Sequence, residues 1–400
     1  MSPLLLLLPV WAGPSFYKDV LPLFQAHCQS CHRAGEAAPM ALTDYATARP
    51  WAKAVKQAVV TRTMPPWFAD AHYGKFSNDA RLTDSAIETI STWVDAGAPE
   101  GDPKDAPKPV AWVNGWKIGA PEVVIEMPRE LEIPAAGTLG YRYVSVPTNF
   151  KEDTWVRFAE VRAGDREHTH HIVVSVKEPG SAPDAQGEFL AGYGPGSMPE
   201  MLGEGQAKLI KAGSEIAFQL HYTTDGKPGR DRSRVGLILA HERPRERVMM
   251  LAAANVRFAV PAGDADYKVE ARVTLHSDAT LVSLLPHMHL RGKSFEFRVA
   301  YPDGRKETLL VVPRYSYDWQ LSYYLDRPLR LPKETTIECT AHFDNSANNP
   351  RNPDPARSVR FGAQSWDEMM IGYFEVAVAP GVEMRDLLLP ANSRVPSNER

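Results

Sequence analysis

Two cysteines separated by two residues, with a histidine directly after the second, stand near the start of the chain: Cys28, Cys31 and His32. This spacing is typical of covalent c-type haem attachment. The two thiols can add to the two vinyl groups on one edge of the haem, and the next residue then presents its imidazole to the iron. The chain contains only 3 cysteines, so the placement of two of them here favours haem over a zinc or redox site.

The haem iron would need a further axial ligand, which is methionine or histidine in electron carriers. We expect Met64, because Pro65 and Pro66 hold the backbone that follows it extended. Met40 and His72 are the alternatives. A haem with such ligands carries one electron at a time.

Five further histidines lie in or beside short apolar segments that have the composition of strands: His170, His171, His221, His287 and His289. Residues two apart face the same side of a strand, so His287 and His289 can bind one ion together. The adjacent His170 and His171 need a bulge or a strand end to do the same. The nearby His168 is expected either to support a ligand or to be exposed.

This arrangement predicts imidazole metal sites, although an isolated histidine is usually a surface or core residue. Imidazole suits zinc, copper, iron and nickel, whereas a thioether selects Cu(I). A methionine partner would therefore separate copper from zinc, and Met369, just before an apolar segment, is the candidate. Copper is the metal we expect.

Four motifs in residues 117–395 resemble, in order and spacing, those of the type II copper, ascorbate-dependent monooxygenases. This family includes the peptidylglycine α-hydroxylating and dopamine β-monooxygenases. The motifs are a His-His pair that opens a strand, a later Leu-His-Tyr, a His-x-His followed by Gly-Lys, and an Asp-Glu-Met before an apolar strand. The resemblance implies two jelly-roll-like β-sandwiches with one copper ion each, and ascorbate as reductant.

The same resemblance assigns roles to the residues. It implies that the electron-transfer copper is held by His170, His171 and His221, and that the oxygen-binding copper is held by His287, His289 and Met369. Tyr373 matches a tyrosine that lines the family's substrate pocket. Leu285 stands where the peptide hydroxylases have an arginine that binds the substrate carboxylate, which disfavours peptide amidation. Cys339 has no cysteine partner in the β region, whereas the animal enzymes are rich in disulfides.

The predicted fold class is multidomain: a small all-α cytochrome c domain followed by two antiparallel β-sandwich copper domains. Residues 14–100 resemble a small cytochrome c domain with its Met-Pro-Pro-Trp segment and final helix, which Thr83 would cap. A proline-rich linker is expected at residues 101–116. Short β-branched and aromatic segments separated by turn residues then predict sandwiches at 117–243 and 244–400.

Composition limits the partners and the compartment. Of 400 residues, 45 are basic and 49 acidic, which gives a net charge of −4 without a basic tract, so a nucleic-acid partner is not expected. Residues 1–13 contain an apolar run that resembles the core of a secretory signal and is too short to span a bilayer. We therefore expect a periplasmic or secreted bacterial protein without stable membrane insertion, since covalent haem attachment is normally completed outside the cytoplasm.

The predicted activity is hydroxylation of a C–H bond in a small organic substrate. One atom of O2 would enter the substrate and the other would leave as water, with two electrons relayed by the haem, by ascorbate or by another external donor. The alternatives are a non-catalytic haem and copper protein that transfers electrons or binds copper, and a zinc hydrolase. The substrate class stays open.

Overall fold

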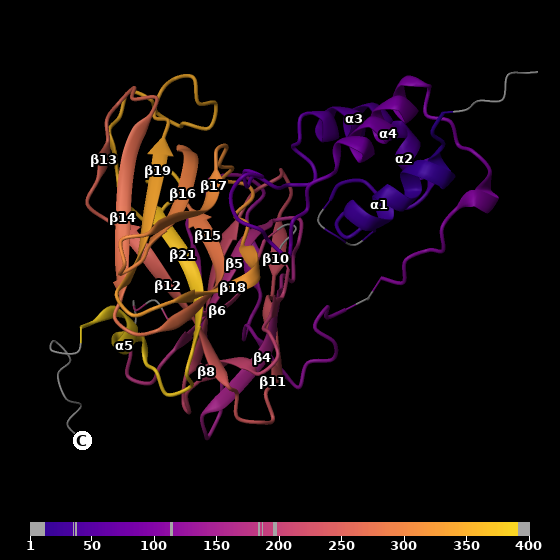
Figure 1. Ribbon diagram of the computed structural model, residues 1–400. Coiled ribbons are helices and arrows are strands. Elements are labelled where there is room, and N and C mark those ends of the chain that lie inside the picture. The colour runs from indigo at the N-terminus through magenta and orange to yellow at the C-terminus, as the bar shows by residue number, and fades with distance from the viewer. Residues whose placement is uncertain are drawn as a thin grey trace, which may run out of the picture. The chain divides into compact units, whose positions relative to one another are not determined.

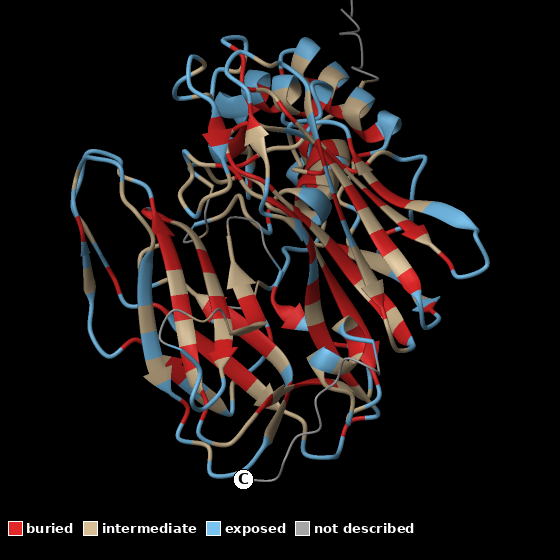
Figure 2. Cartoon of the chain, turned by 90° about the vertical axis from the view of Figure 1, so that its left-hand side faces the viewer, coloured by how far each residue is buried: buried red, intermediate tan, exposed pale blue. Residues whose placement is uncertain are grey.

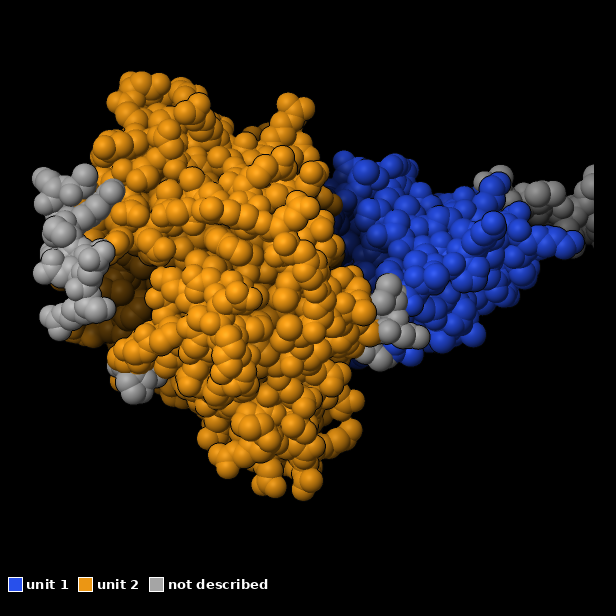
Figure 3. Space-filling view, turned by 90° about the horizontal axis from the view of Figure 1, so that it is seen from below, with its two compact units in different colours: residues 1–67, 80–112 blue, residues 68–79, 113–400 orange. Residues whose placement is uncertain are grey.

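The computed structural model describes residues 13–34, 36, 38–112, 115–182, 185, 187–194 and 198–390. The chain forms two compact units, drawn in different colours in Figure 3. Unit 1 comprises residues 1–67 and 80–112, and unit 2 comprises residues 68–79 and 113–400. Nearly all of the apolar run predicted as a secretory signal lies outside the described residues.

Unit 1 contains the helical elements η1 (Phe16–Val20), α1 (Leu21–His27), α2 (Tyr45–Ala48), η2 (Arg49–Trp51), α3 (Ala52–Val60), α4 (Asp84–Asp95) and η3 (Pro103–Asp105). Thr83 caps α4, since its side chain accepts a hydrogen bond from the backbone N–H of Ala86. The apolar faces of these elements meet in one core, where the Phe16, Phe24 and Trp93 rings contact one another.

Unit 2 is built from strands (Figure 1). Its first half contains β1 (Val123–Glu126), β2 (Leu131–Ile133), β3 (Arg142–Pro147), β4 (Thr154–Arg162), β5 (Thr169–Lys177), β6 (Glu188–Tyr193), β7 (Glu200–Met201), β8 (Gln206–Ile210), β9 (Glu215–Tyr222), β10 (Gly229–Asp231) and β11 (Arg234–Leu239). Its second half contains β12 (Glu246–Asn255), β13 (Ala259–Val260), β14 (Tyr267–Leu275), β15 (Ala279–His287), β16 (Gly292–Ala300), β17 (Lys306–Val312), β18 (Tyr323–Leu331), β19 (Thr335–Phe343), β20 (Val359–Arg360), β21 (Met370–Val378) and helix α5 (Met384–Leu388).

One sheet of nine strands runs through both halves of unit 2. Its order is β1-β11-β4-β8-β12-β21-β15-β18, with β7 paired to β4. A four-stranded sheet, β3-β9-β5-β6, packs on its first half, and another, β14-β19-β16-β17, on its second half. Buried residues alternate with more exposed ones along many of these strands (Figure 2), as expected for layers that share a core.

The predicted fold class, an all-α cytochrome c domain followed by two separate β-sandwich domains, is wrong. Strands account for 38% of the chain and helices for 13%, so the protein is mostly β. No separate all-α cytochrome domain is evident in the described part of the chain, where the elements before residue 100 are short and linked by irregular segments. Residues 68–79, expected in that domain, belong to unit 2, where Phe76 forms a β-bridge with Leu325.

The two expected sandwich domains are also joined. Strand β8 pairs in parallel with β12 through the positions Gln206↔Glu246 and Ala207↔Arg247, so the large sheet crosses the predicted seam near residue 243. A parallel pairing of only two residues leaves no local pattern in the sequence. The boundary near residue 243 therefore carried no sign that one sheet crosses it. No helix among the described residues is long and apolar enough to cross a membrane.

Candidate functional site

Three histidines from two neighbouring strands of unit 2 meet at one point. His170 and His171 lie at the start of β5, and His221 lies near the end of β9, where it pairs with His171. The register of the two strands shifts between Thr169 and His171, so the irregularity that adjacent ligands require is present. One ring nitrogen from each histidine lies within 4.8 Å of the others. We call this cluster the first imidazole site.

The surroundings keep the first imidazole site neutral. Burial is the main cause that lowers the pKa of all three histidines, and the neighbouring His170 lowers that of His221 further, to about 4. The Nδ1 atom of His221 is buried without a hydrogen-bond partner, and the Nδ1 atoms of His170 and His171 lie 3.0 Å apart. Neutral imidazoles whose nitrogens converge, one of them without a partner, fit a metal ion. The ring of Tyr141 contacts His171 and His221 at centroid distances of 5.7 and 5.0 Å.

His168 supports the turn that leads into the first imidazole site. Its side chain is buried, and its ring nitrogens lie 2.7 Å from Asp165 Oδ2 and 3.1 Å from Asp225 Oδ1. These two carboxylates raise the pKa of His168 although burial opposes them. A Cβ at Gly229 would collide with the side chains of His168 and Asp165, so a larger residue there would displace this pair. Of the two roles expected for His168, the supporting one agrees with this geometry.

Two more histidines meet in the second half of unit 2. His287 ends β15 and His289 follows in the next turn, with their rings 5.3 Å apart and nearly perpendicular. The Nδ1 atom of His287 lies 2.7 Å from Gln320 Oε1, and that of His289 lies 3.3 Å from the carbonyl of Asp367. The Nε2 atom of His289 is buried without a partner. Partners on Nδ1 leave Nε2 as the nitrogen that can bind a metal.

Met369 lies in the segment that faces this histidine pair. Strands β15 and β21 are antiparallel and pair His287 with Ile371. Met369 directly precedes β21, and its neighbours Asp367 and Glu368 contact His289. Tyr373, two residues beyond Ile371, pairs with Leu285, and its ring lies 5.9 Å from that of His287. Burial raises the pKa of Tyr373 and lowers those of His287 and His289, the latter to about 3. We call His287, His289 and Met369 the second site.

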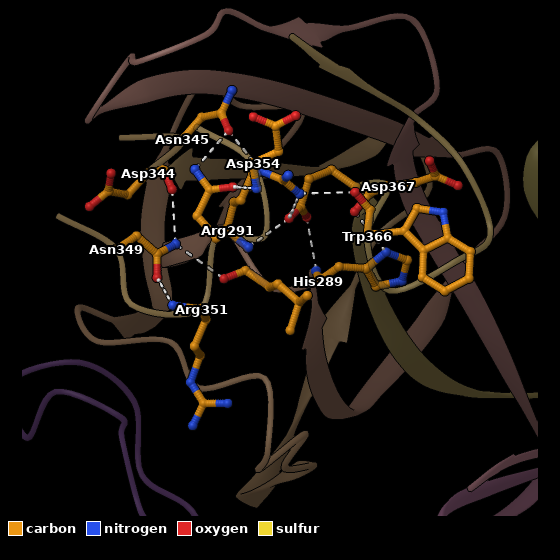
Figure 4. A network of polar contacts seen from close by, with 12 residues as sticks. His289, Arg291, Asp344, Asn345, Asn349, Arg351, Asp354, Trp366 and Asp367 are labelled. Atoms are coloured by element: carbon orange, nitrogen blue, oxygen red, sulfur yellow. Dashed lines mark hydrogen bonds and ion pairs between the residues drawn. The ribbon is translucent and has the colours of Figure 1, made fainter. Parts of the chain in front are cut away.

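Polar contacts tie the two segments of the second site together, and Figure 4 shows His289, Arg291 and Asp367 in this network. Glu368, with no exposed side-chain surface, accepts hydrogen bonds from the backbone N–H groups of His289 at 3.0 Å and Arg291 at 2.6 Å. The guanidinium of Arg291 lies 3.8 Å from that carboxyl and also donates to Asn345 Oδ1 and to the carbonyl of Trp366. Burial raises the pKa of Glu368 to about 8. Glu368, which directly precedes Met369, therefore holds this segment against the turn that carries His289.

The cysteine motif lies in unit 1, directly after α1. The backbone folds tightly, since the N–H groups of Cys31 and His32 both donate to the carbonyl of Cys28. His32 Nδ1 lies 3.3 Å from the carbonyl of Met40, which leaves Nε2 available for an iron ion. These features fit covalent haem.

The candidates for the further iron ligand are placed differently. Met64 and Met40 lie in unit 1 with the cysteine motif, and both are half-buried. His72 belongs to unit 2, where its exposed side chain lies 2.7 Å from Asp70 Oδ1. Met64 stays the predicted ligand, with Met40 and His72 as the alternatives.

Sequence reasoning missed several residues that contact the sites. Three of them lie outside the four motifs: Tyr141, Tyr317 and Gln320. Glu368 belongs to the Asp-Glu-Met motif, but no role was predicted for it. Their neighbours in the sequence carry no periodic signal. Only the polar and aromatic composition of residues 315–320, between two strands, could have drawn attention to that loop.

Comparisons with known proteins do not identify the chain. No family model matches it, and neither does any curated protein. A structure of infectious bursal disease virus, Gt strain, covers 72% of this chain and 77% of its own chain at 10% identity and a TM-score of 0.21. A structure of allantoicase covers 54% and 79% at 10% identity and a TM-score of 0.19. Similarity this low supports no conclusion about function.

Proposed function

We propose that this chain is a copper-dependent monooxygenase that hydroxylates a C–H bond of a small organic substrate with O2, like the type II copper family that it resembles. The observation that carries the proposal is the presence of two unlike imidazole sites in one β unit. The first brings three neutral histidines within 4.8 Å, and the second brings two histidines to the segment of Met369.

Copper fits these residues better than zinc does. The donors that converge are imidazoles, with a thioether in the facing segment of the second site, and a thioether prefers Cu(I). The unpartnered nitrogens of His221 and His289 are buried where an ion would satisfy them. When bound, copper would supply one-electron transfer at the first site and O2 activation at the second.

The residues around the second site would orient its ligands and the substrate. Gln320 and the carbonyl of Asp367 hold the two imidazole rings with Nε2 free, and Glu368 fixes the turn that carries His289. Tyr373 keeps its proton, because burial raises its pKa, so its hydroxyl can donate a hydrogen bond to a substrate. Leu285, its strand partner, offers no charge to a substrate carboxylate, which agrees with a neutral or apolar substrate.

We further propose that electrons come through a covalent haem bound by Cys28, Cys31 and His32, with Met64 as the other axial ligand, or directly from ascorbate. Attachment of the haem to the same chain would set its effective concentration near the copper sites at about the millimolar range. The haem also implies a periplasmic or secreted location. The contact between His32 Nδ1 and the Met40 carbonyl would orient the imidazole ring so that its Nε2 atom faces the iron.

The test measures O2 consumption and product formation by the full chain loaded with copper, with ascorbate and a panel of small substrates under isotope-labelled O2. We expect label in a hydroxylated product, and loss of product in His289→Ala. His276→Ala is the matched control, since His276 pairs with Glu334 away from both sites. Copper binding and redox cycling without product would favour the non-catalytic alternative, and retention of zinc with exclusion of copper would favour the hydrolase.

A further inference from the structure

One aromatic ring contacts both imidazole sites. Tyr317, in the connection between β17 and β18, stacks on His170 with a centroid distance of 5.4 Å and an angle of 17° between the rings. On its other side it meets His289 edge-on, at 6.3 Å and 88°. His170 belongs to the first imidazole site and His289 to the second, so the ring of Tyr317 connects them by direct contact.

The loop around Tyr317 is attached to the second site at two other points. The Tyr315 hydroxyl accepts a hydrogen bond from the N–H of Met288 at 3.0 Å and donates one to the carbonyl of the same residue at 2.8 Å. Gln320 contacts His287. Residues 315–320 therefore hold the residue between the two histidines of the second site as well as one of the two imidazoles.

An ion pair fixes the loop from its other side. Asp318, next to Tyr317, binds the guanidinium of Arg351 through both carboxylate oxygens, one of them at 2.8 Å. The backbone N–H of Arg351 donates to Asn349, whose side-chain amide donates to the carbonyls of Leu290 and Asp344, beside the buried network of Figure 4. The ring of Tyr317 is thus placed by contacts on both sides and is 7% exposed, which leaves it little freedom to move.

The position of this ring, between one histidine of each site, suits a bridge. The Tyr141 ring, by comparison, contacts His171 and His221, which both belong to the first imidazole site. Stacked and edge-on contacts bring the π-systems of aromatic rings together. The sites are therefore joined by three aromatic rings in contact, in the order His170, Tyr317 and His289.

We propose that Tyr317 provides the electronic contact through which one electron passes from a metal ion at the first imidazole site to a metal ion at the second. The first ion is oxidised by one unit and the second is reduced by one unit. No bond forms or breaks, and Tyr317 is unchanged at the end. The electron enters the first site from a one-electron donor, namely ascorbate or the haem. This inference rests on the two metal sites of the proposed function, but it does not require that hydroxylation occurs.

The test compares four full-length variants loaded with copper: Tyr317→Phe, Tyr317→Leu, Tyr317→Met and Tyr301→Leu. Tyr301 is a buried tyrosine beside Arg305 in the β16–β17 turn and serves as the matched control. Each oxidised protein is mixed anaerobically with a limiting amount of ascorbate. Freeze-quench EPR then follows the two Cu(II) signals, since a nitrogen-only site and a sulfur-containing site give different hyperfine patterns.

We expect Tyr317→Phe and Tyr301→Leu to equilibrate the electron as fast as the unmodified chain. Tyr317→Leu and Tyr317→Met should be slower by about tenfold or more, which corresponds to a barrier higher by about 1.4 kcal/mol. Unchanged rates in both non-aromatic variants would overturn the proposal, as would an equal loss in Tyr317→Phe. If Tyr317→Leu does not fold, Tyr317→Met and Tyr317→Phe still decide.

Pulsed EPR on the same samples measures the distance between the two Cu(II) ions. A rate loss with an unchanged distance supports a bridge, whereas a rate loss with a longer distance makes Tyr317 a spacer and overturns the proposal. The two hypotheses also fail separately. A chain that binds no copper would refute the proposed function before this test, and a chain that transfers the electron without hydroxylating any substrate would keep the bridge and refute the oxygenase.

Discussion

Replacement of Glu368 by alanine should weaken the second site and the fold around it. Glu368 is fully buried, accepts two backbone hydrogen bonds and lies 3.8 Å from the buried guanidinium of Arg291. Removal of the carboxyl leaves both backbone N–H groups buried without an acceptor, which costs about 1–3 kcal/mol for each group, so we expect a loss of about 2–6 kcal/mol. Glu368→Gln keeps one acceptor oxygen but turns an NH2 group toward the other donor, so we expect a smaller loss of about 1–3 kcal/mol.

The assay is chemical denaturation of the metal-free chain, followed by circular dichroism of the strands, together with a copper titration of each variant. Glu270→Ala is the control, since Glu270 forms an exposed pair with Lys268 in the same half of unit 2 and should lose less than about 1 kcal/mol. We expect Glu368→Ala to lose copper at the second site and to keep it at the first. Equal stability of Glu368→Ala and Glu270→Ala would refute this reasoning, as would loss of copper from both sites.

Three further changes have expected outcomes. Met369→Leu should lower the Cu(I) affinity of the second site by about tenfold or more, which is about 1.4 kcal/mol. A competition titration measures this affinity, and the control Met370→Leu, at a core position, should keep it. Equal affinities of the two variants would exclude a thioether ligand. The double change of Cys28→Ser and Cys31→Ser should abolish covalent attachment of haem, because neither thiol is left to form a thioether bond, and haem staining of the denatured full chain tests it; absence of covalent haem from the unmodified chain made with the attachment machinery would contradict the motif. Burial, and next the charge of Glu375, raise the pKa of Glu200 to about 8, so the folded chain holds a proton that the unfolded chain releases near 4.5. The free energy of unfolding should therefore fall as the pH rises between the pKa of the unfolded chain and that of the folded chain. Denaturation at about pH 6 and about pH 9 measures this fall, which should be smaller in Glu200→Gln than in the unmodified chain. An identical fall in both would refute the assignment.

Local patterns in the sequence predicted the strands well. The apolar segment around His221, expected to be a strand, is β9, and the predicted cap Thr83 caps α4. Both depend on short-range physics, namely the alternation of side chains along a strand and a side-chain oxygen that accepts a hydrogen bond from a free N–H group. The pairing of His171 with His221 follows from such strands once they lie side by side.

The arrangement of the units was not predictable in this way. Residues 68–79 were expected within the cytochrome-like region 14–100, and only long-range contacts, such as the bridge from Phe76 to Leu325, assign them to unit 2. The short parallel pairing of β8 with β12 likewise has no local signature, so the sequence suggested two β domains where the chain has one unit. Tyr317 and Gln320 reach the imidazoles from a loop whose path depends on the tertiary fold.

The number of copper ions bound per chain, measured by elemental analysis on the full chain and on two single variants, tests whether the chain carries two unlike copper sites. We expect about two copper ions per chain, with one lost in His221→Ala and the other lost in His289→Ala, because these residues belong to different sites. EPR should show that each variant keeps a different Cu(II) signal. A single copper ion in the unmodified chain, or loss of the same signal in both variants, would contradict it.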